Sequence, residues 1–352
     1  MRILSRYLSS VVAGSILLVL MVIVSMDVLA AVIDGAGEIK GDYTFVEVLK
    51  YVGTTLPGRI YENIPLSALI GCLIGLGILA GNSELVVMRA AGVSLLRMVS
   101  FVLRPVLTII IFGVLLGEFA VPYTDQLAEG RKMLLRGEQE RIASASGLWN
   151  REGSEFIHIN VVLPNGKLFG VTRYRFDEGR IEQVSFSTEA RYLGDHWLEE
   201  EGRVTRFVDE RAETDTFVTR RWNSDLAPDL LRLVSMPPAS LSMANLYDYA
   251  AFLEGQEQDA TNHWLAFWRK AMQPLTTISL VLVAVSFIFG PLREATMGFR
   301  IFAGVIIGIA FNTSQQFLGP ASLVYGFEPF LAVLLPVLLC ALVGLWLLRR
   351  AA

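Results

Sequence analysis

Charged residues crowd into the middle of this sequence, and no other feature constrains its fold as much. Residues 122–270 hold 42 of the chain's 64 charged side chains, 18 of them Lys or Arg and 24 Asp or Glu. The flanks are nearly free of charge and contain six apolar stretches, three on each side of the polar middle. A helix crosses a hydrocarbon layer about 30 Å thick with about 20 apolar residues. The sequence therefore predicts a helical membrane protein with three plus three spans and an inserted aqueous domain.

Composition supports a membrane protein and argues against other classes. Of the 352 residues, 53% are hydrophobic, which is too many for a typical soluble protein of this length. The net charge of −4 and the lack of a basic run argue against a nucleic-acid partner. Cys72 and Cys340 both lie in apolar stretches, where cysteine usually acts as a small hydrophobic residue. We therefore expect neither a disulfide framework nor a metal site.

The predicted spans set the domain limits. They cover residues 9–33, 64–80, 98–121, 272–289, 301–318 and 329–348. The first three spans form a domain over 1–121, the polar insert is 122–270, and the last three spans lie in 271–352, with Pro122 expected to end the third span. A cleaved signal peptide is the alternative for the first stretch, because Val28-Leu29-Ala30 resembles a cleavage site. The stretch is, however, longer than a usual signal core.

Turn residues divide the insert into short runs rich in strand-forming residues. These runs cover 156–163, 168–176, 181–186 and 203–208, and Pro164-Asn165-Gly166 separates the first two. Asn-Gly between such runs is a strong hairpin signal. We predict an all-β, antiparallel domain: a sandwich, a jelly roll or an open barrel, with a jelly-roll-like fold preferred. A helical connection follows, with a helix over 243–254 capped by Ser242 and an amphipathic segment over 264–271. Another amphipathic segment is expected over 45–56.

Basic residues predict the orientation in the membrane. With the N-terminus inside, nine arginines fall on the cytoplasmic side, whereas the short outer loops hold Lys40, Lys50 and Arg59. The excess on one side predicts that both termini are cytoplasmic and that the β domain lies outside, in the periplasm of a bacterium. The nine are Arg2, Arg6, Arg89, Arg97, Arg104, Arg293, Arg300, Arg349 and Arg350.

Motifs for nucleotide, metal or acyl chemistry are missing from the sequence. The single Gly-Lys pair, Gly166-Lys167, precedes Leu168 rather than the Ser or Thr of a phosphate-binding loop. The three histidines lack metal-ligand spacing, and no Gly-x-Ser-x-Gly occurs. We therefore predict a non-enzymatic protein with no catalytic residue, metal or cofactor of its own.

A short segment between the second and third spans is the candidate interaction site. Ser83 is expected to cap a helix, Glu84 to lie in its first turn and Gly92 to end it. Its exposed face is expected to carry four apolar side chains, which would dock onto a separate ATPase or lie on lipid headgroups. The candidate coupling residues are Ser83, Glu84, Leu85, Val86, Val87, Met88, Arg89, Ala90, Ala91 and Gly92.

Polar and small residues within the spans are candidates for helix packing or for a lipid cavity. One face of the fifth span carries a stripe of such residues, and the first span carries one carboxylate. Because polar side chains are costly in lipid, they are expected to face protein or water. Packing and lining of a substrate cavity remain equally open for the stripe. The residues are Asp27, Gly304, Gly308, Asn312, Gln315 and Gln316. Glycines 71, 75, 77 and 81 predict close helix contacts in the second span.

Several blocks of residues resemble a known family. The main blocks are the 83–92 segment, Gly147-Leu148-Trp149 and the 286–293 run, Ser-Phe-Ile-Phe-Gly-Pro-Leu-Arg. Arg6-Tyr7, Gly319-Pro320 and Val324-Tyr325-Gly326 add to the match. Together they resemble the lipopolysaccharide export permease family LptF/LptG over essentially the whole chain, and its LptG members more closely than LptF.

The resemblance implies a permease subunit of an ATP-driven, ABC-type exporter in the inner membrane of Gram-negative bacteria. It would pair with an LptF-like permease and bind an LptB-like ATPase dimer, which uses ATP and Mg. Lipopolysaccharide would pass from the membrane to a periplasmic β-jelly-roll bridge that begins with a bitopic LptC-like protein. The resemblance places Glu84 and Arg89 as polar contacts of the docking helix and the first and fifth spans around the lipid cavity. The segment after the first span has Asp34, Glu38 and only Lys40, which departs from relatives with several basic residues there.

Two further expectations bear on transport. Because each exposed CH₂ costs roughly 0.8 kcal/mol, an apolar groove through the β domain would suit acyl chains. The alternative to a permease is a membrane-anchored adaptor or sensor, whose β domain binds a partner while the spans only anchor it. A secondary transporter is disfavoured because the spans lack the ionisable residues and broken helices of ion coupling.

Overall fold

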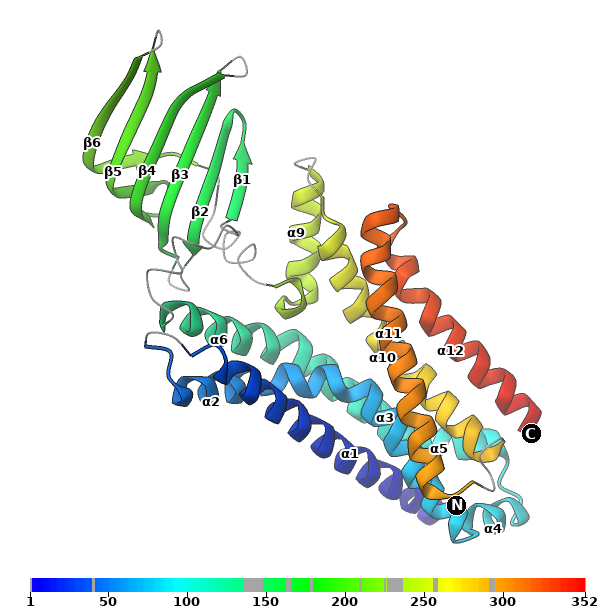
Figure 1. Ribbon diagram of the computed structural model, residues 1–352. Helices are drawn as coiled ribbons and strands as arrows, with labels where there is room; N and C mark the ends of the chain where they lie inside the picture. Colours follow the sequence, from blue (N-terminus) through cyan, green and yellow to red (C-terminus); the bar gives the residue numbers. More distant parts are fainter. Residues whose placement is uncertain are drawn as a thin grey trace. The chain divides into compact units, whose positions relative to one another are not determined.

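The computed structural model describes residues 2–39, 42–135, 148–162, 166–177, 180–208, 211–224, 226, 237–255, 259–290 and 295–351. It divides into two compact units, which are described separately (Figure 1). The helical unit comprises Met1–Gly37, Val52–Thr124 and Ser242–Ala352. The sheet unit comprises Glu38–Tyr51 and Asp125–Leu241. The Gly147 of the Gly-Leu-Trp block, Lys40, Pro164-Asn165 and Pro291-Leu292-Arg293 lie outside the described residues.

Six long helices confirm the predicted three-plus-three arrangement of apolar spans. Each is long and apolar enough to cross a membrane. They exceed the predicted limits because helical structure continues beyond the apolar core, and the expected segment over 264–271 is continuous with the fourth of them. The helices are α1 (Arg2–Ala36), α3 (Leu56–Gly81), α5 (Leu95–Leu115), α10 (Thr261–Phe289), α11 (Met297–Tyr325) and α12 (Pro329–Ala351).

The third span does not end at Pro122, which corrects the sequence prediction. A π-helical turn, η1 (Leu116–Ala120), follows α5, and α6 (Val121–Leu135) continues from it. Proline cannot donate a backbone hydrogen bond, so it usually ends or kinks a helix. A π turn changes the hydrogen-bond register by one residue. It lies directly before Pro122, which falls in the first turn of α6, where a missing donor is tolerated.

Close packing of α1 against α3 forms the centre of the helical unit. A Cβ placed on Gly71 would lie 2.5 Å from the Cα of Ile16, and one on Gly75 would lie 3.0 Å from the Oγ of Ser15. Gly77 meets the side chains of α11 in the same way, whereas Gly81 has open space around it. The prediction of close contacts is therefore correct for three of the four glycines.

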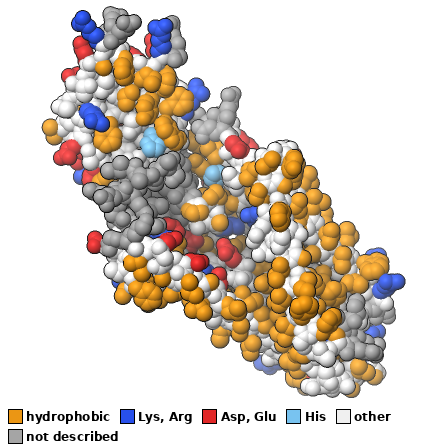
Figure 2. All heavy atoms as spheres, viewed as in Figure 1, with side chains coloured by type: hydrophobic (Ala, Val, Ile, Leu, Met, Phe, Trp, Pro, Cys, Tyr) orange, Lys and Arg blue, Asp and Glu red, His pale blue; other side chains and the backbone are white. Residues whose placement is uncertain are grey.

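Apolar side chains around this contact form one core, mainly from α1, α3, α5 and α10, with further side chains from the segment 85–93 and from α12. In Figure 1, α10 and α12 lie side by side, and the two helices are in extensive contact. Hydrophobic side chains also cover most of the face of the helical unit seen in Figure 2. On α1, Leu18, Met21 and Leu29 are more than half exposed, as expected of side chains that meet lipid.

Six antiparallel strands in consecutive order form the single sheet among the described residues of the sheet unit (Figure 1). The predicted antiparallel β domain is confirmed, although the first and last strands were not predicted and the fourth and fifth are longer than expected. The strands are β1 (Leu148–Glu152), β2 (Glu155–Val162), β3 (Leu168–Asp177), β4 (Arg180–Tyr192), β5 (Trp197–Val208) and β6 (Arg211–Trp222).

The expected helical segments beside the spans are present. Helix α9 covers Met243–Gly255, and the Oγ of Ser242 accepts a hydrogen bond from the Asn245 backbone N–H at 3.1 Å, as predicted for the cap. Helix α2 covers Phe45–Thr54. A short 3-10 turn, η2, covers Pro238–Ser240.

Candidate functional site

The candidate coupling segment forms helix α4 (Glu84–Ala90), between α3 and α5. Figure 1 shows it at the end of the helical unit that carries the two chain termini. Gly92 has a φ of 83°, and its N–H donates to the Arg89 carbonyl at 3.0 Å, so it ends the helix as predicted. Ser83 does not cap the helix through its side chain: its φ is 60°, in the left-handed region. A capping side chain needs extended backbone at this position.

The two faces of α4 differ, which corrects the expectation that all four apolar residues are exposed. Leu85 and Met88 are 4% and 5% exposed and belong to the core of the helical unit. Val86 and Val87 are 55% and 66% exposed. Residues three apart lie on one helix face, so the buried pair fixes α4 to the helices beneath it. The free face then presents the two valines.

Polar contacts fix the start of α4 to the first span. The hydroxyl of Tyr7 donates to the Oε1 of Glu84 at 3.4 Å, and the side-chain amide of Asn82 donates to the same oxygen at 3.3 Å. Glu84 therefore serves within this chain as an acceptor. Arg89 and Ala90 are exposed on the same helix, and Ala91 and Gly92, directly after it, are exposed as well.

The polar stripe of the fifth span divides into two parts on α11. Gly304 and Gly308 are buried against α3: Cβ atoms there would lie 2.5 Å from a Leu73 methyl and 2.1 Å from a Leu66 methyl. Gln315 donates to the Val333 carbonyl of α12 at 3.3 Å. Asn312 and Gln316 are exposed on the helical unit. The glycines therefore pack helices, whereas Asn312 and Gln316 are open to a cavity or a partner.

An ion pair that was not predicted from the sequence joins the first two spans. The Nη1 of Arg59 on α3 lies 2.8 Å from the Oδ2 of Asp27 on α1, and the side chains are 20% and 40% exposed. A charged side chain in a membrane helix needs such a partner. The contact assigns Arg59 to a span rather than to an outer loop.

Further cations of the spans donate to backbone carbonyls. The Nη1 of Arg300 donates to the Gly77 carbonyl at 2.8 Å, and the Nζ of Lys270 donates to the Gly117 carbonyl of the π turn at 3.3 Å. The Oε2 of Glu118 in that turn accepts the Met243 N–H at 2.9 Å, at the start of α9. This contact gives Glu118 a structural role, because it joins the π turn to the start of α9.

The sheet contains a buried ion pair that sequence analysis missed. Arg173 on β3 donates two hydrogen bonds to Glu199 on β5, at 3.1 and 2.9 Å, and a third to Glu155 on β2, at 3.2 Å. The side chains of Arg173 and Glu199 are 5% and 1% exposed. Two parallel N–H bonds from one guanidinium fix the orientation of both groups. The pair is therefore a rigid element of the sheet face.

Metal-ligating side chains do not cluster in the part of the chain that the structure describes: no group of three or more His, Cys, Asp or Glu is placed to hold an ion. His158 instead lies against the Trp149 ring, with centroids 4.6 Å apart, and burial lowers its pKa. His196 contacts Asp195, and hydrogen bonding from His196 lowers the pKa of that carboxyl.

Six apolar helices interrupted by an antiparallel sheet define a polytopic membrane protein with an inserted β unit. The family model for the lipopolysaccharide export system permease LptF/LptG matches residues 6–350, so the chain belongs to that family. It is 32% identical over 351 residues to the lipopolysaccharide export system permease protein LptG of Haemophilus influenzae, covering 99% of this chain and 98% of the relative. The protein of that name from Escherichia coli K12 is 31% identical over 353 residues, with the same coverage.

Proposed function

We propose that this chain is a permease subunit of an ATP-driven exporter that extracts lipopolysaccharide from the inner membrane of Gram-negative bacteria. The family match over nearly the whole chain supports the export role. Both termini and α4 would lie in the cytoplasm, and the sheet unit in the periplasm. The lipid would pass from there to a periplasmic bridge of β-jelly-roll domains.

The proposal assigns energy supply to a separate protein. An LptB-like ATPase dimer would bind ATP and Mg, an LptF-like permease would form the second half of the pore, and a bitopic LptC-like protein would receive the lipid. The sequence has no phosphate-binding loop, which supports an external ATPase. We propose no catalytic residue, metal or cofactor in this chain.

The main support for this proposal is helix α4, because one of its faces is anchored in the core and the other exposes apolar side chains. Leu85 and Met88 anchor it in the core, and Val86 and Val87 stay exposed. Apolar side chains on a helix face are suited to a groove on a partner. We propose that the valines enter such a groove on the ATPase and that Arg89 supplies a polar contact at its rim.

The lipid cavity is proposed between α1 and α11 and the second permease. Asp27, Asn312 and Gln316 are polar residues of the candidate set that these two helices leave at least partly exposed. Because polar groups that face lipid are costly, a water-containing cavity or a partner suits them better. Gly304, Gly308 and Gln315 would maintain the packing of α11 beside it.

Co-purification tests the docking of α4. Val87→Asp and Arg89→Glu should each reduce the amount of ATPase that remains bound in mild detergent. The first substitution would place a charge in the apolar contact, and the second reverses the charge of the polar contact. Arg350→Glu, a charge reversal on α12 outside α4, is the matched control. Undiminished binding in both α4 variants contradicts the docking role. A purified complex with no ATPase and no second permease would instead indicate a membrane-anchored adaptor or sensor.

A further inference from the structure

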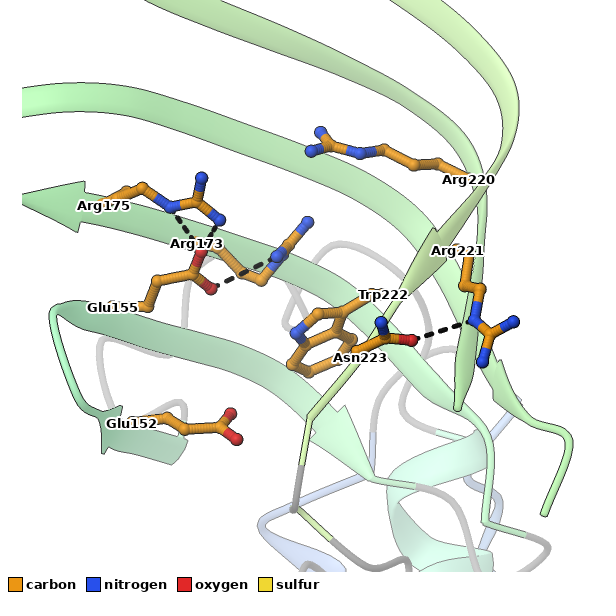
Figure 3. Close-up of a pocket in the computed structure, with 8 residues that line it drawn as sticks. All are labelled: Glu152, Glu155, Arg173, Arg175, Arg220, Arg221, Trp222 and Asn223. Atoms are coloured by element: carbon orange, nitrogen blue, oxygen red, sulfur yellow. Dashed lines mark hydrogen bonds and ion pairs between the residues drawn. The ribbon is translucent and has the colours of Figure 1, made fainter. Parts of the chain in front are cut away.

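A charged pocket of about 350 Å³ lies on one face of the sheet (Figure 3). Four arginines and two glutamates line it, together with Trp222 and Asn223. Its lining is therefore unsuited to acyl chains, in contrast to the apolar groove expected for the β domain. The charged residues are Arg173, Arg175, Arg220, Arg221, Glu152 and Glu155.

Most of the charged groups in this pocket already have partners. Glu155 accepts hydrogen bonds from Arg173, at 3.2 Å, and from Arg175, at 2.8 Å. Arg221 donates to the Asn223 side chain at 2.9 Å, and Glu152 accepts the Ser224 hydroxyl at 2.6 Å. These charged groups are therefore already paired or hydrogen-bonded within the sheet unit.

Two donors differ from the rest. The Nη1 of Arg220 and the Nε1 of Trp222 are both buried, and neither has a hydrogen-bond partner among the described residues. Trp222 as a whole is only 2% exposed. Figure 3 shows its indole nitrogen facing the side of the pocket that Glu155 and Arg173 line, and the Arg220 guanidinium extending over the pocket. A buried donor without an acceptor costs free energy.

The chemistry of these two donors indicates which class of ligand the pocket could bind. Indole and guanidinium nitrogens donate hydrogen bonds and cannot accept them. A ligand that satisfies both must offer several acceptor oxygens, and the excess of arginine over glutamate favours a negative charge. Burial and then the nearby Arg173 lower the pKa of Arg220, although Glu199 on β5 acts in the opposite direction. Guanidinium groups bind phosphate oxygens with good geometry.

We propose that this pocket binds a phosphate group, and that Arg220 and Trp222 donate to its oxygens. A pocket of this volume accommodates a phosphorylated sugar as well as free phosphate. The proposal goes beyond the export function and does not depend on it, because it concerns phosphate recognition by the sheet unit alone.

Isothermal titration calorimetry on the full chain in detergent tests the proposal. Inorganic phosphate and glucose 1-phosphate are titrated at constant ionic strength, with glucose as the neutral control. Binding of at least one phosphate compound, without binding of glucose, is expected. Tighter binding of the sugar phosphate assigns the site to a phosphorylated headgroup, and tighter binding of inorganic phosphate assigns it to the free ion.

Substitutions locate the binding in the pocket. Arg220→Gln removes the charge, and Trp222→Phe removes the indole donor but keeps an aromatic ring. Each should weaken phosphate binding about tenfold or more, as expected for loss of a hydrogen bond to a charged group. Arg211→Gln, at an exposed position on the same strand, should leave it unchanged. Failure of both phosphate compounds to bind, or binding that survives both substitutions, overturns the proposal.

Discussion

Arg173 and Glu199 lie two strands apart and form a two-bond ion pair in the interior of the sheet face. The adjacent Glu200 pairs with Arg191 at 3.3 Å, but both of those side chains are about a third exposed or more. Neighbouring glutamates on β5 therefore make one buried and one exposed ion pair. This contrast allows a matched test of what burial contributes.

Glu199→Gln should destabilise the sheet by about 3–5 kcal/mol, because it leaves the Arg173 charge buried without its main partner. Glu200→Gln should change stability by less than about 1 kcal/mol, as is typical of exposed pairs. Hydrogen exchange measured by mass spectrometry on peptides from β3 and β5 separates the two. Equal loss of protection in the two variants would contradict a special role for the buried pair.

Gly71→Ala should destabilise the contact between α1 and α3. The new methyl group would lie 2.5 Å from the Ile16 Cα, and backbone cannot move aside as a side chain can. Overpacking of this kind costs about 1–3 kcal/mol. Gly81→Ala is the control, since nothing lies within 4 Å of its added methyl group. Thermal unfolding in detergent should show a lower midpoint for the first variant alone.

Leu85→Ala should destabilise the helical unit by about 2–4 kcal/mol, because it leaves a cavity beneath α4. Val87→Ala should change stability by no more than about 0.5 kcal/mol, because its side chain is 66% exposed. Thermal unfolding of the purified chain measures both. A large loss in the Val87 variant without any partner present would mean that this side chain packs within the chain.

The length of an apolar stretch is visible in a sequence, and the six spans were predicted for that reason. The buried face of a seven-residue helix cannot be identified in this way. Residues 85–88 are four consecutive apolar residues, and which two of them are buried depends on the helices that pack around α4. Strand β6 was missed because its residues are mostly exposed, so no alternation of apolar and polar residues marks it. Pairing with β5 holds it in the sheet.

The charged pocket was beyond sequence reasoning because its parts are far apart in the chain. Arg173 and Arg220 meet only through the order of β3 to β6. A weak signal existed: Arg173 and Arg175 are two residues apart, so they share one face of a strand. That face also carries the buried Ile157 of the neighbouring strand, which pairs directly with Arg173. Arginines on a core-facing side indicate buried partners or a binding site.

His158 should make the sheet sensitive to acid. Burial against Trp149 lowers its pKa below the ordinary value of 6.5, so the unfolded chain takes up a proton at this site more readily than the folded chain. Its contribution to stability is therefore present above pH 6.5 and is lost as the pH falls from there through the lowered pKa. His158→Gln should flatten the pH dependence of the hydrogen-exchange protection of β2 peptides between pH 7 and 5. An unchanged slope in that variant would show that protonation of other groups causes the acid sensitivity.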